Sequence, residues 1–182
     1  MQASFDTLSK MRHILIILIL LTPLSAWCNT LQGKVVKVAD GDTVTIVDEK
    51  GDKHRIRLGG IDAPEKDQPY GSESTKNLEW LVYGKGVTIE YDKHDRYGRI
   101  VGKVLVNPQG DVFCLAIGCV RKVDAGLEQI KSGLAWHYKK YQKEQSKQDR
   151  KLYSKAERNA RRKPVGLWVG KERMPPWQWR RK

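Results

Sequence analysis

The chain has 182 residues, and 34 Lys and Arg side chains against 21 Asp and Glu give it a formal net charge of +13. This length corresponds to one ordinary domain with its own hydrophobic core and excludes a large multidomain protein. The charge predicts a polyanionic partner: a nucleic acid, an anionic membrane surface or an acidic polysaccharide.

Residues 1–28 have the composition of a secretory signal peptide. Basic residues precede a continuous apolar run over residues 14–21, and small residues follow it. The run is much shorter than the ~20 residues that a membrane-spanning helix needs, so we expect no stable membrane anchor. We predict a periplasmic or secreted protein, and the sequence leaves open whether cleavage falls before Trp27 or before Asn29.

The remaining chain is expected to form one domain over residues 29–170 and a basic, Trp- and Pro-rich tail over residues 171–182. In chain order we expect strands over residues 31–38, 43–47 and 53–58, a loop over 59–71, a helix from Ser72 or Ser74 to about Tyr83, strands over 87–91, 100–106 and 112–115, and helices over 124–132 and 146–161. The strands alternate or are rich in β-branched residues, and Gly and Pro mark the loops. In the last helix, Leu152, Ala156 and Ala160 recur at a spacing of four and predict its buried face. These elements fit the α+β class, as a small closed barrel with about three packed helices.

The cysteines and histidines give weaker signals. Cys114 and Cys119 form either a small-loop disulfide in an oxidising compartment or two buried free thiols, and the sequence leaves this open. No second Cys or His pair has zinc-ligand spacing, which argues against a zinc site. The histidines His54, His94 and His137 lack the partners of a histidine-based catalytic site.

Two acidic turns follow strand-like segments, at residues 40–42 and 62–65. If the strands between them pair as a hairpin, both turns meet at one edge of a sheet, which would bring Asp42, Asp62 and Glu65 together. Clustered carboxylates repel one another unless a cation or an arginine compensates them. A hard divalent cation, which prefers carboxylate and carbonyl oxygens, is the expected compensation. Either turn on its own would be an ordinary surface turn.

Five short motifs occur in a characteristic order: Asp40-Gly41-Asp42-Thr43-Val44, Arg57-x-x-x-x-Asp62-x-Pro64-Glu65, Asp95-Arg96-Tyr97-Gly98-Arg99, Gly133-Leu134-Ala135 and Gly166-Leu167-Trp168. In order and spacing the chain resembles the staphylococcal (micrococcal, thermonuclease) nuclease family over roughly residues 31–168. The resemblance implies a five-stranded OB-fold barrel, whose groove suits extended polymers. It also implies an exported, monomeric, calcium-dependent nuclease that hydrolyses DNA and RNA with low sequence specificity and leaves 3′-phosphate ends. Residues 113–123 depart from the family pattern, because this connection is longer and richer in cysteine.

The resemblance carries specific roles onto this sequence. The side chains of Asp42 and Asp62 and the backbone carbonyl of Ala63 would bind Ca²⁺, and Glu65 would activate or position the attacking water. Arg57 and Arg99 would grip the scissile phosphate, since planar guanidinium groups match its charge distribution. The expected substrate-contacting residues are Tyr97, Tyr138 and Tyr141, by base stacking or phosphate contact.

Two other functions remain open at this point. One is a non-catalytic nucleic-acid-binding OB-fold module, and the other is a basic envelope protein that binds anionic lipid or polysaccharide. The role of the C-terminal tail is also open. Its prolines predict an extended segment. Trp177 and Trp179 lie among basic residues, and they either stack on bases or pack back on the barrel.

Overall fold

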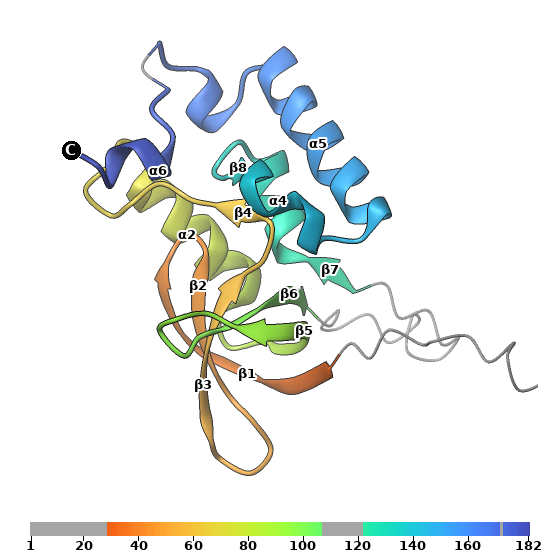
Figure 1. The fold of residues 1–182 in the computed structure, drawn as a ribbon. Coiled ribbons are helices and arrows are strands. Elements are labelled where there is room, and N and C mark those ends of the chain that lie inside the picture. The colour runs from red at the N-terminus through yellow and green to blue at the C-terminus, as the bar shows by residue number, and fades with distance from the viewer. Residues whose placement is uncertain (1–28, 107–121, 172) are drawn as a thin grey trace, which may run out of the picture.

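The chain folds around a closed β-barrel (Figure 1). The computed structural model describes residues 29–106, 122–171 and 173–182. The strands of the main sheet are β1 (Asn29–Asp40), β2 (Thr43–Val47), β3 (Lys53–Leu58), β5 (Gly86–His94), β6 (Ile100–Val106) and β7 (Val123–Asp124). They are ordered β3-β2-β1-β5-β6-β7, and a parallel pairing between β3 and β6 closes five of them into the barrel. The predicted α+β class with a five-stranded OB-fold barrel is confirmed.

Helices cover one end and one side of the barrel. The helical elements are α2 (Gly71–Val82), α4 (Ala125–Lys131), α5 (Lys147–Arg162), α6 (Pro176–Trp179) and two 3₁₀ helices, η1 (Lys139–Glu144) and η2 (Gly166–Trp168). A separate two-stranded ladder joins β4 (Ile61–Asp62) to β8 (Trp136–His137). In Figure 1, α4 and α5 lie side by side and α6 lies beside the start of α2.

Two apolar clusters hold these parts together. The main core combines inward residues of the barrel strands with Leu78 of α2, Ile130 of α4 and Tyr153 of α5. A second cluster contains Trp136, Ala160, Leu167 and Trp168, and Tyr70 and Trp177 pack against it. This second cluster therefore connects the C-terminal segment to the body of the domain. Among the residues that the structure describes, no helix is long and apolar enough to cross a membrane.

The period of the strands decides which side chains enter the barrel. On β3, Ile56 and Leu58 are buried inside, so Arg55 and Arg57 point outward. Thr43 at the start of β2 lies opposite Arg57 in the antiparallel register. Arg57 therefore leaves the barrel directly beside the turn that joins β1 to β2.

Several sequence-based expectations are wrong in detail. Helix α2 is capped by Tyr70 in the left-handed region, and neither Ser72 nor Ser74 is the cap. The Ser74 hydroxyl instead donates to the Leu134 carbonyl at 2.7 Å. In α5, Leu152 is exposed, because the core is reached from the neighbouring face through Tyr153.

Other corrections concern the connections between elements. The expected loop over residues 59–71 contains β4, because Ile61 and Asp62 pair with β8. The tail is not extended throughout, since Pro176 is the first residue of α6, where proline's fixed φ suits a helix and its missing N–H costs nothing. The signal peptide, the strand expected at 112–115 and both Cys114 and Cys119 lie outside the described residues.

Candidate active site

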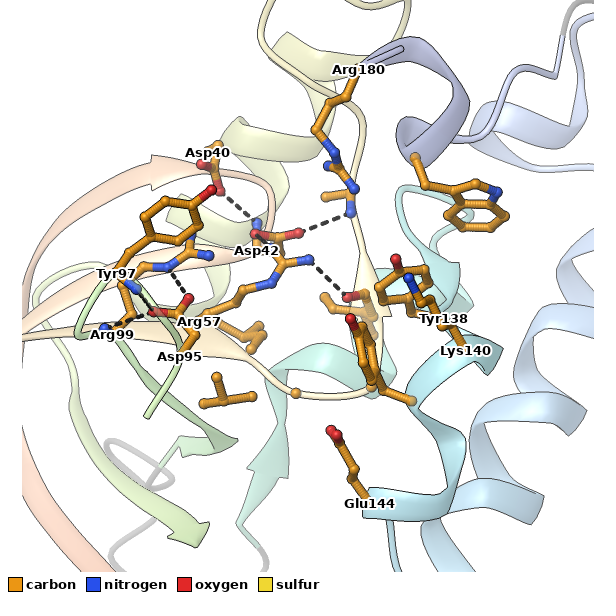
Figure 2. A pocket seen from close by; sticks show the side chains of 18 of the residues that line it. Asp40, Asp42, Arg57, Asp95, Tyr97, Arg99, Tyr138, Lys140, Glu144 and Arg180 are labelled. Carbon is orange, nitrogen blue, oxygen red and sulfur yellow. Dashed lines mark hydrogen bonds and ion pairs between the residues drawn. The ribbon is translucent and has the colours of Figure 1, made fainter. Parts of the chain in front are cut away.

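The predicted site residues meet at a groove of about 880 Å³ on one end of the barrel (Figure 2). Its walls come from the β1–β2 turn, β3, the loop after β3, the β5–β6 turn, η1 and the C-terminal segment. The predicted residues that line it are Asp42, Arg57, Ala63, Glu65, Tyr97, Arg99, Tyr138 and Tyr141. Asp62 is fully buried and is joined to the others by ion pairs.

The β1–β2 turn holds the Asp42 carboxylate in a fixed position. Asp42 is buried, its backbone N–H donates to Asp40 Oδ1 at 3.0 Å, and its own Oδ2 accepts from the Ala63 N–H at 3.1 Å. Gly41 packs so closely that an added Cβ would lie 1.9 Å from Ser74 Oγ. A side chain at this position would push the turn away from α2, and the carboxylate would move with it.

Arg57 connects the two buried aspartates. Its Nη1 donates to Asp42 Oδ1 and its Nη2 donates to Asp62 Oδ1 at 2.8 Å. Burial by itself lowers the pKa of Arg57, but the two carboxylates outweigh this and raise the pKa. The guanidinium group therefore remains charged, and the fork geometry orients it in the plane of its two partners.

Asp62 stands on β4, where the pairing with β8 buries it completely. Burial raises the pKa of the Asp62 carboxyl, and the guanidinium groups of Arg180 and Arg57 oppose this rise. Arg180 Nη2 donates to Asp62 Oδ2 at 2.7 Å, and Arg180 Nη1 donates to Glu65 Oε1. Asp42, Asp62 and Glu65 thus lie along one line of carboxylates that two arginines bridge.

The donor chemistry of this site fits a hard divalent cation. Asp42 and Asp62 are two buried carboxylates beside one another, and their charge must be compensated. In the arrangement described, Arg57 and Arg180 provide that compensation. No three or more His, Cys, Asp or Glu side chains in residues 29–106, 122–171 and 173–182 are already arranged to hold a metal ion. Asp42, Asp62 and the carbonyl of Ala63 therefore stay predicted ligands, and a bound cation would require at least one guanidinium group to move.

Arg99 lies across the groove in the β5–β6 turn. Asp95 accepts the backbone N–H groups of Tyr97 and Arg99, and its Oδ2 accepts from Arg99 Nε at 2.7 Å. The Tyr97 ring is 66% exposed, and the guanidinium groups of Arg96 and Arg99 lie 4.8 and 5.6 Å from its centroid. This turn therefore presents a cation and an aromatic face to the groove together.

The other two predicted tyrosines lie on the opposite wall. Tyr138 and Tyr141 pack edge to face at a centroid separation of 5.2 Å, and Trp177 stacks on Tyr138 at 5.2 Å with an interplanar angle of 21°. Tyr138 is half-buried as a result, whereas Tyr141 is 43% exposed. Tyr97 and Tyr141 therefore have the more accessible rings.

Arg180 is the residue that the sequence did not single out. It lies beyond the last motif, and the only signal for it is that the tail is basic. Nothing in the spacing of the tail indicates that its third-last residue returns to Asp62, 118 residues earlier in the chain.

Comparison with known proteins shows which family the chain resembles. Residues 55–170 match the family described as staphylococcal nuclease homologue. The chain belongs to the staphylococcal nuclease family. The matched segment ends at residue 170, so Arg180 lies outside it, in a part of the chain that the family match does not cover.

Several relatives cover most of the chain. An uncharacterized endonuclease of Escherichia coli is 37% identical over 153 residues, which is 84% of this chain and 87% of that protein. An uncharacterized endonuclease of Haemophilus influenzae is 36% identical over 168 residues, or 92% of this chain and 82% of that protein. A micrococcal nuclease of Shigella flexneri is 32% identical over 179 residues, or 97% of this chain and 95% of that protein.

Proposed function

We propose that this protein is a nuclease that hydrolyses phosphodiester bonds of DNA and RNA with low sequence specificity and depends on Ca²⁺. The observation that carries the proposal is the groove, which is lined by Asp42, Glu65, Arg57 and Arg99. Arg57 also forms an ion pair with the buried Asp62. Relatives over nearly the whole chain are named endonuclease or micrococcal nuclease. The proposal extends that activity to this chain on the strength of both.

The two arginines supply charge complementary to a phosphate in the transition state of hydrolysis. Charge develops on the equatorial and leaving oxygens, and planar guanidinium groups can donate two parallel hydrogen bonds to it. Arg57 is oriented by Asp42 and Asp62, and Arg99 is oriented by Asp95. Both guanidinium groups are therefore positioned before substrate arrives, so little reorganisation is needed.

The carboxylates have two separate tasks in the proposal. Asp42 and Asp62, with the carbonyl of Ala63, would hold the cation, which when bound supplies positive charge as a Lewis acid at a phosphoryl oxygen. Glu65 is half-exposed and lines the groove, where a carboxylate can accept a proton from water or orient it. The residues of this chain thus provide cation ligands, a water-orienting base and phosphate donors in one groove.

Low sequence specificity is proposed from the kinds of contact that the groove offers. Its accessible groups are charges, which bind phosphates, and tyrosine rings, which stack on any base. The net charge of +13 would further concentrate a polyanion at the surface. Export to the periplasm or medium and a monomeric state are proposed with it, from the character of residues 1–28 and the size of the domain.

Incubation of the purified protein with single-stranded DNA and with RNA tests the proposal. We expect cleavage with Ca²⁺, none in excess chelator, and 3′-phosphate ends on the products. The variant Asp42→Asn is expected to lose Ca²⁺ affinity and turnover together. Full turnover in chelator would contradict the metal dependence. Tight nucleic-acid binding without cleavage at any Ca²⁺ concentration would favour the non-catalytic binding module instead.

A further inference from the structure

The C-terminal segment, residues 174–182, is docked on the groove by specific contacts. The Gln68 side chain donates to the Met174 carbonyl at 2.6 Å, and Pro176 is buried. The Trp179 indole N–H donates to Asp67 Oδ2 at 3.3 Å. These contacts join the segment to the loop that carries Glu65 and leads into α2.

Trp177 fixes the other side of the segment. Its ring stacks on Tyr138 and packs edge to face against Trp136 at a centroid separation of 5.7 Å. Trp136 belongs to β8, which pairs directly with Asp62 and its neighbour on β4. The short helix α6 is therefore held on one side by the loop before α2 and on the other by β8 and the residue that follows it.

This docking points Arg180 into the groove (Figure 2), where it contacts the carboxylates of Asp62 and Glu65. Its Nη2 lies 2.7 Å from Asp62 Oδ2 and its Nη1 lies 3.3 Å from Asp62 Oδ1, so Asp62 is engaged through both oxygens. The same Nη1 donates to Glu65 Oε1. The Arg180 side chain is 42% exposed, which leaves it room to move into the groove.

We propose that Arg180 is a third guanidinium group of the active site, which occupies Asp62 and Glu65 in the absence of cation and transfers to a substrate phosphate when a cation binds. The proposal rests on the nuclease function proposed above and adds a residue to its site. It also couples the two ligands, because cation binding makes Arg180 available to the substrate.

The exchange follows from the contacts of Asp62. Oδ1 already accepts from Arg57 and Arg180, and Oδ2 accepts from Arg180. A cation that coordinates Asp62 must take an oxygen from a guanidinium donor, and the two positive charges then repel each other. Arg57 is largely buried between two aspartates, whereas Arg180 is partly exposed on a terminal segment, so Arg180 is the group that moves.

The released guanidinium group stays near the scissile phosphate. Trp177, three residues earlier, remains stacked on Tyr138 and keeps the end of the chain at the groove. Arg57 and Arg99 line the same groove. A phosphate bound by these two arginines would therefore lie within reach of a third charged donor.

A calorimetric titration of Ca²⁺ alone into the full chain tests the first half of the proposal. Arg180→Ala is expected to bind Ca²⁺ about tenfold more tightly than wild type, because a charged hydrogen-bonded competitor is gone. Arg181→Ala is the matched control. Arg181 is the next residue in the chain and lines the same groove, so its replacement removes an equal charge. Among the described residues, Arg181 forms no ion pair with a carboxylate. Equal Ca²⁺ affinities for the two variants would overturn the proposal.

The second half is tested with a phosphorothioate-linked oligodeoxynucleotide, which keeps its backbone charge and resists hydrolysis. At saturating Ca²⁺, Arg180→Ala is expected to bind this probe about tenfold more weakly than Arg181→Ala does. Equal affinities would show that Arg180 only blocks the cation site, and the proposal would be overturned. Arg180→Gln, which keeps the side-chain stem, repeats both measurements if the alanine variant folds poorly.

Neither measurement depends on turnover. If wild-type protein cleaves no nucleic acid while both affinity shifts are found, the proposed nuclease function fails and the exchange at Asp62 stands. If cleavage is found without the shifts, the function stands and Arg180 is not part of the site.

Discussion

Arg55 and Arg57 stand two residues apart on the outer face of β3, yet their surroundings differ. Arg57 lies opposite Thr43 at the end of the strand, where the β1–β2 turn and β4 supply two buried carboxylates. Arg55 lies two residues earlier on the strand, opposite Thr45, and is exposed. Position relative to the acidic turn therefore decides which arginine contacts the buried carboxylates.

Arg57→Lys and Arg99→Lys are each expected to lower kcat by ~10²–10³, the usual effect of removing one donor to transition-state charge. Lysine keeps the charge but lacks the two Nη groups with which Arg57 donates to two carboxylates and the Nε–H that Arg99 donates to Asp95. Each tenfold loss corresponds to ~1.4 kcal/mol of transition-state stabilisation. Steady-state kinetics on single-stranded DNA measures the effect.

Arg55→Lys is the control for these variants, and we expect wild-type turnover from it. Circular dichroism would show whether the Arg57 variant keeps its fold, since that side chain also compensates Asp42 and Asp62. A folded variant at either position with undiminished kcat would remove that arginine from the proposed mechanism.

At the scale of elements, two glycines allow the backbone after α4 to pack directly against the backbone of η2. Gly133 has φ +67° and Gly166 has φ +54°, and the Leu167 N–H donates to the Gly133 carbonyl at 2.9 Å. A Cβ on Gly133 would lie 2.2 Å from the Val165 carbonyl oxygen. Both glycines are thus required by conformation and by the close approach of two backbones.

We expect Gly133→Ala to destabilise the protein by more than about 3 kcal/mol, because backbone must move in addition to the left-handed strain. Gly84→Ala is the matched control: Gly84 has φ +72°, and an added Cβ would meet nothing within 4 Å. Its cost should be only about 1 kcal/mol from the left-handed conformation. Urea denaturation compares the two, and similar losses would contradict the argument from backbone contact.

The turn of the β2–β3 hairpin is stabilised by hydrogen bonds to the carboxylate of Asp48. Its carboxylate accepts the backbone N–H groups of Lys50 and Asp52, and His54 Nε2 lies 2.8 Å from it. The hydrogen bond with His54, followed by the backbone N–H donors, lowers the pKa of Asp48 below its usual 3.8. A lowered carboxyl pKa stabilises the folded state above about pH 4, and this contribution is lost as the pH falls through the folded-state pKa.

Asp48→Asn is therefore expected to lower the melting temperature near pH 6, and the difference from wild type should shrink as the pH falls below 3.8. Asp52→Asn removes an equal charge from the same turn, where the contact is made by the backbone N–H of Asp52. Thermal unfolding followed by circular dichroism across this pH range makes the comparison. A difference that grows toward low pH would contradict the assigned direction.

Sequence patterns predicted the barrel strands well because each has a local cause. The bounds of β2, β3 and β6 match the predicted ones, since a period of two places Ile56 and Leu58 inside. The start of α2 was missed because Tyr70 caps it through a left-handed backbone without a side-chain hydrogen bond. β4 was missed because a two-residue strand depends on its partner β8, 75 residues away, and leaves no periodic signal.

In the site, too, contacts with a local cause were predicted and contacts that depend on tertiary packing were missed. Asp42 and Arg57 meet because a hairpin joins them, and that contact could be inferred from the order of the strands. The return of Arg180 to Asp62 depends on Trp177 packing against Trp136, which is a tertiary contact without a local pattern. The tail also forms a helical turn where its prolines predicted an extended chain.

At the scale of the whole molecule, the groove is built from both ends of the described chain. Asp42 comes from the first barrel turn and Arg180 from the third-last position, and Gln68 joins Met174 across a separation of 106 residues. The arginine that completes the acidic side of the groove is therefore positioned by contacts between parts of the chain that lie far apart in sequence. Trp177 packs against Trp136 and Tyr138 and so anchors the C-terminal segment to the groove.

Trp177→Ala is expected to destabilise the protein by about 1–3 kcal/mol, because its ring packs on both Trp136 and Tyr138. Trp80→Ala is the control, since that ring is 76% exposed and contacts Lys85 at the surface. Urea denaturation measures both variants, and probe binding at saturating Ca²⁺ separates two roles for Trp177. Packing predicts lowered stability for Trp177→Ala and near wild-type stability for Trp80→Ala. Base stacking alone predicts weakened oligonucleotide binding with stability unchanged, and that result would contradict the docking of α6 by Trp177.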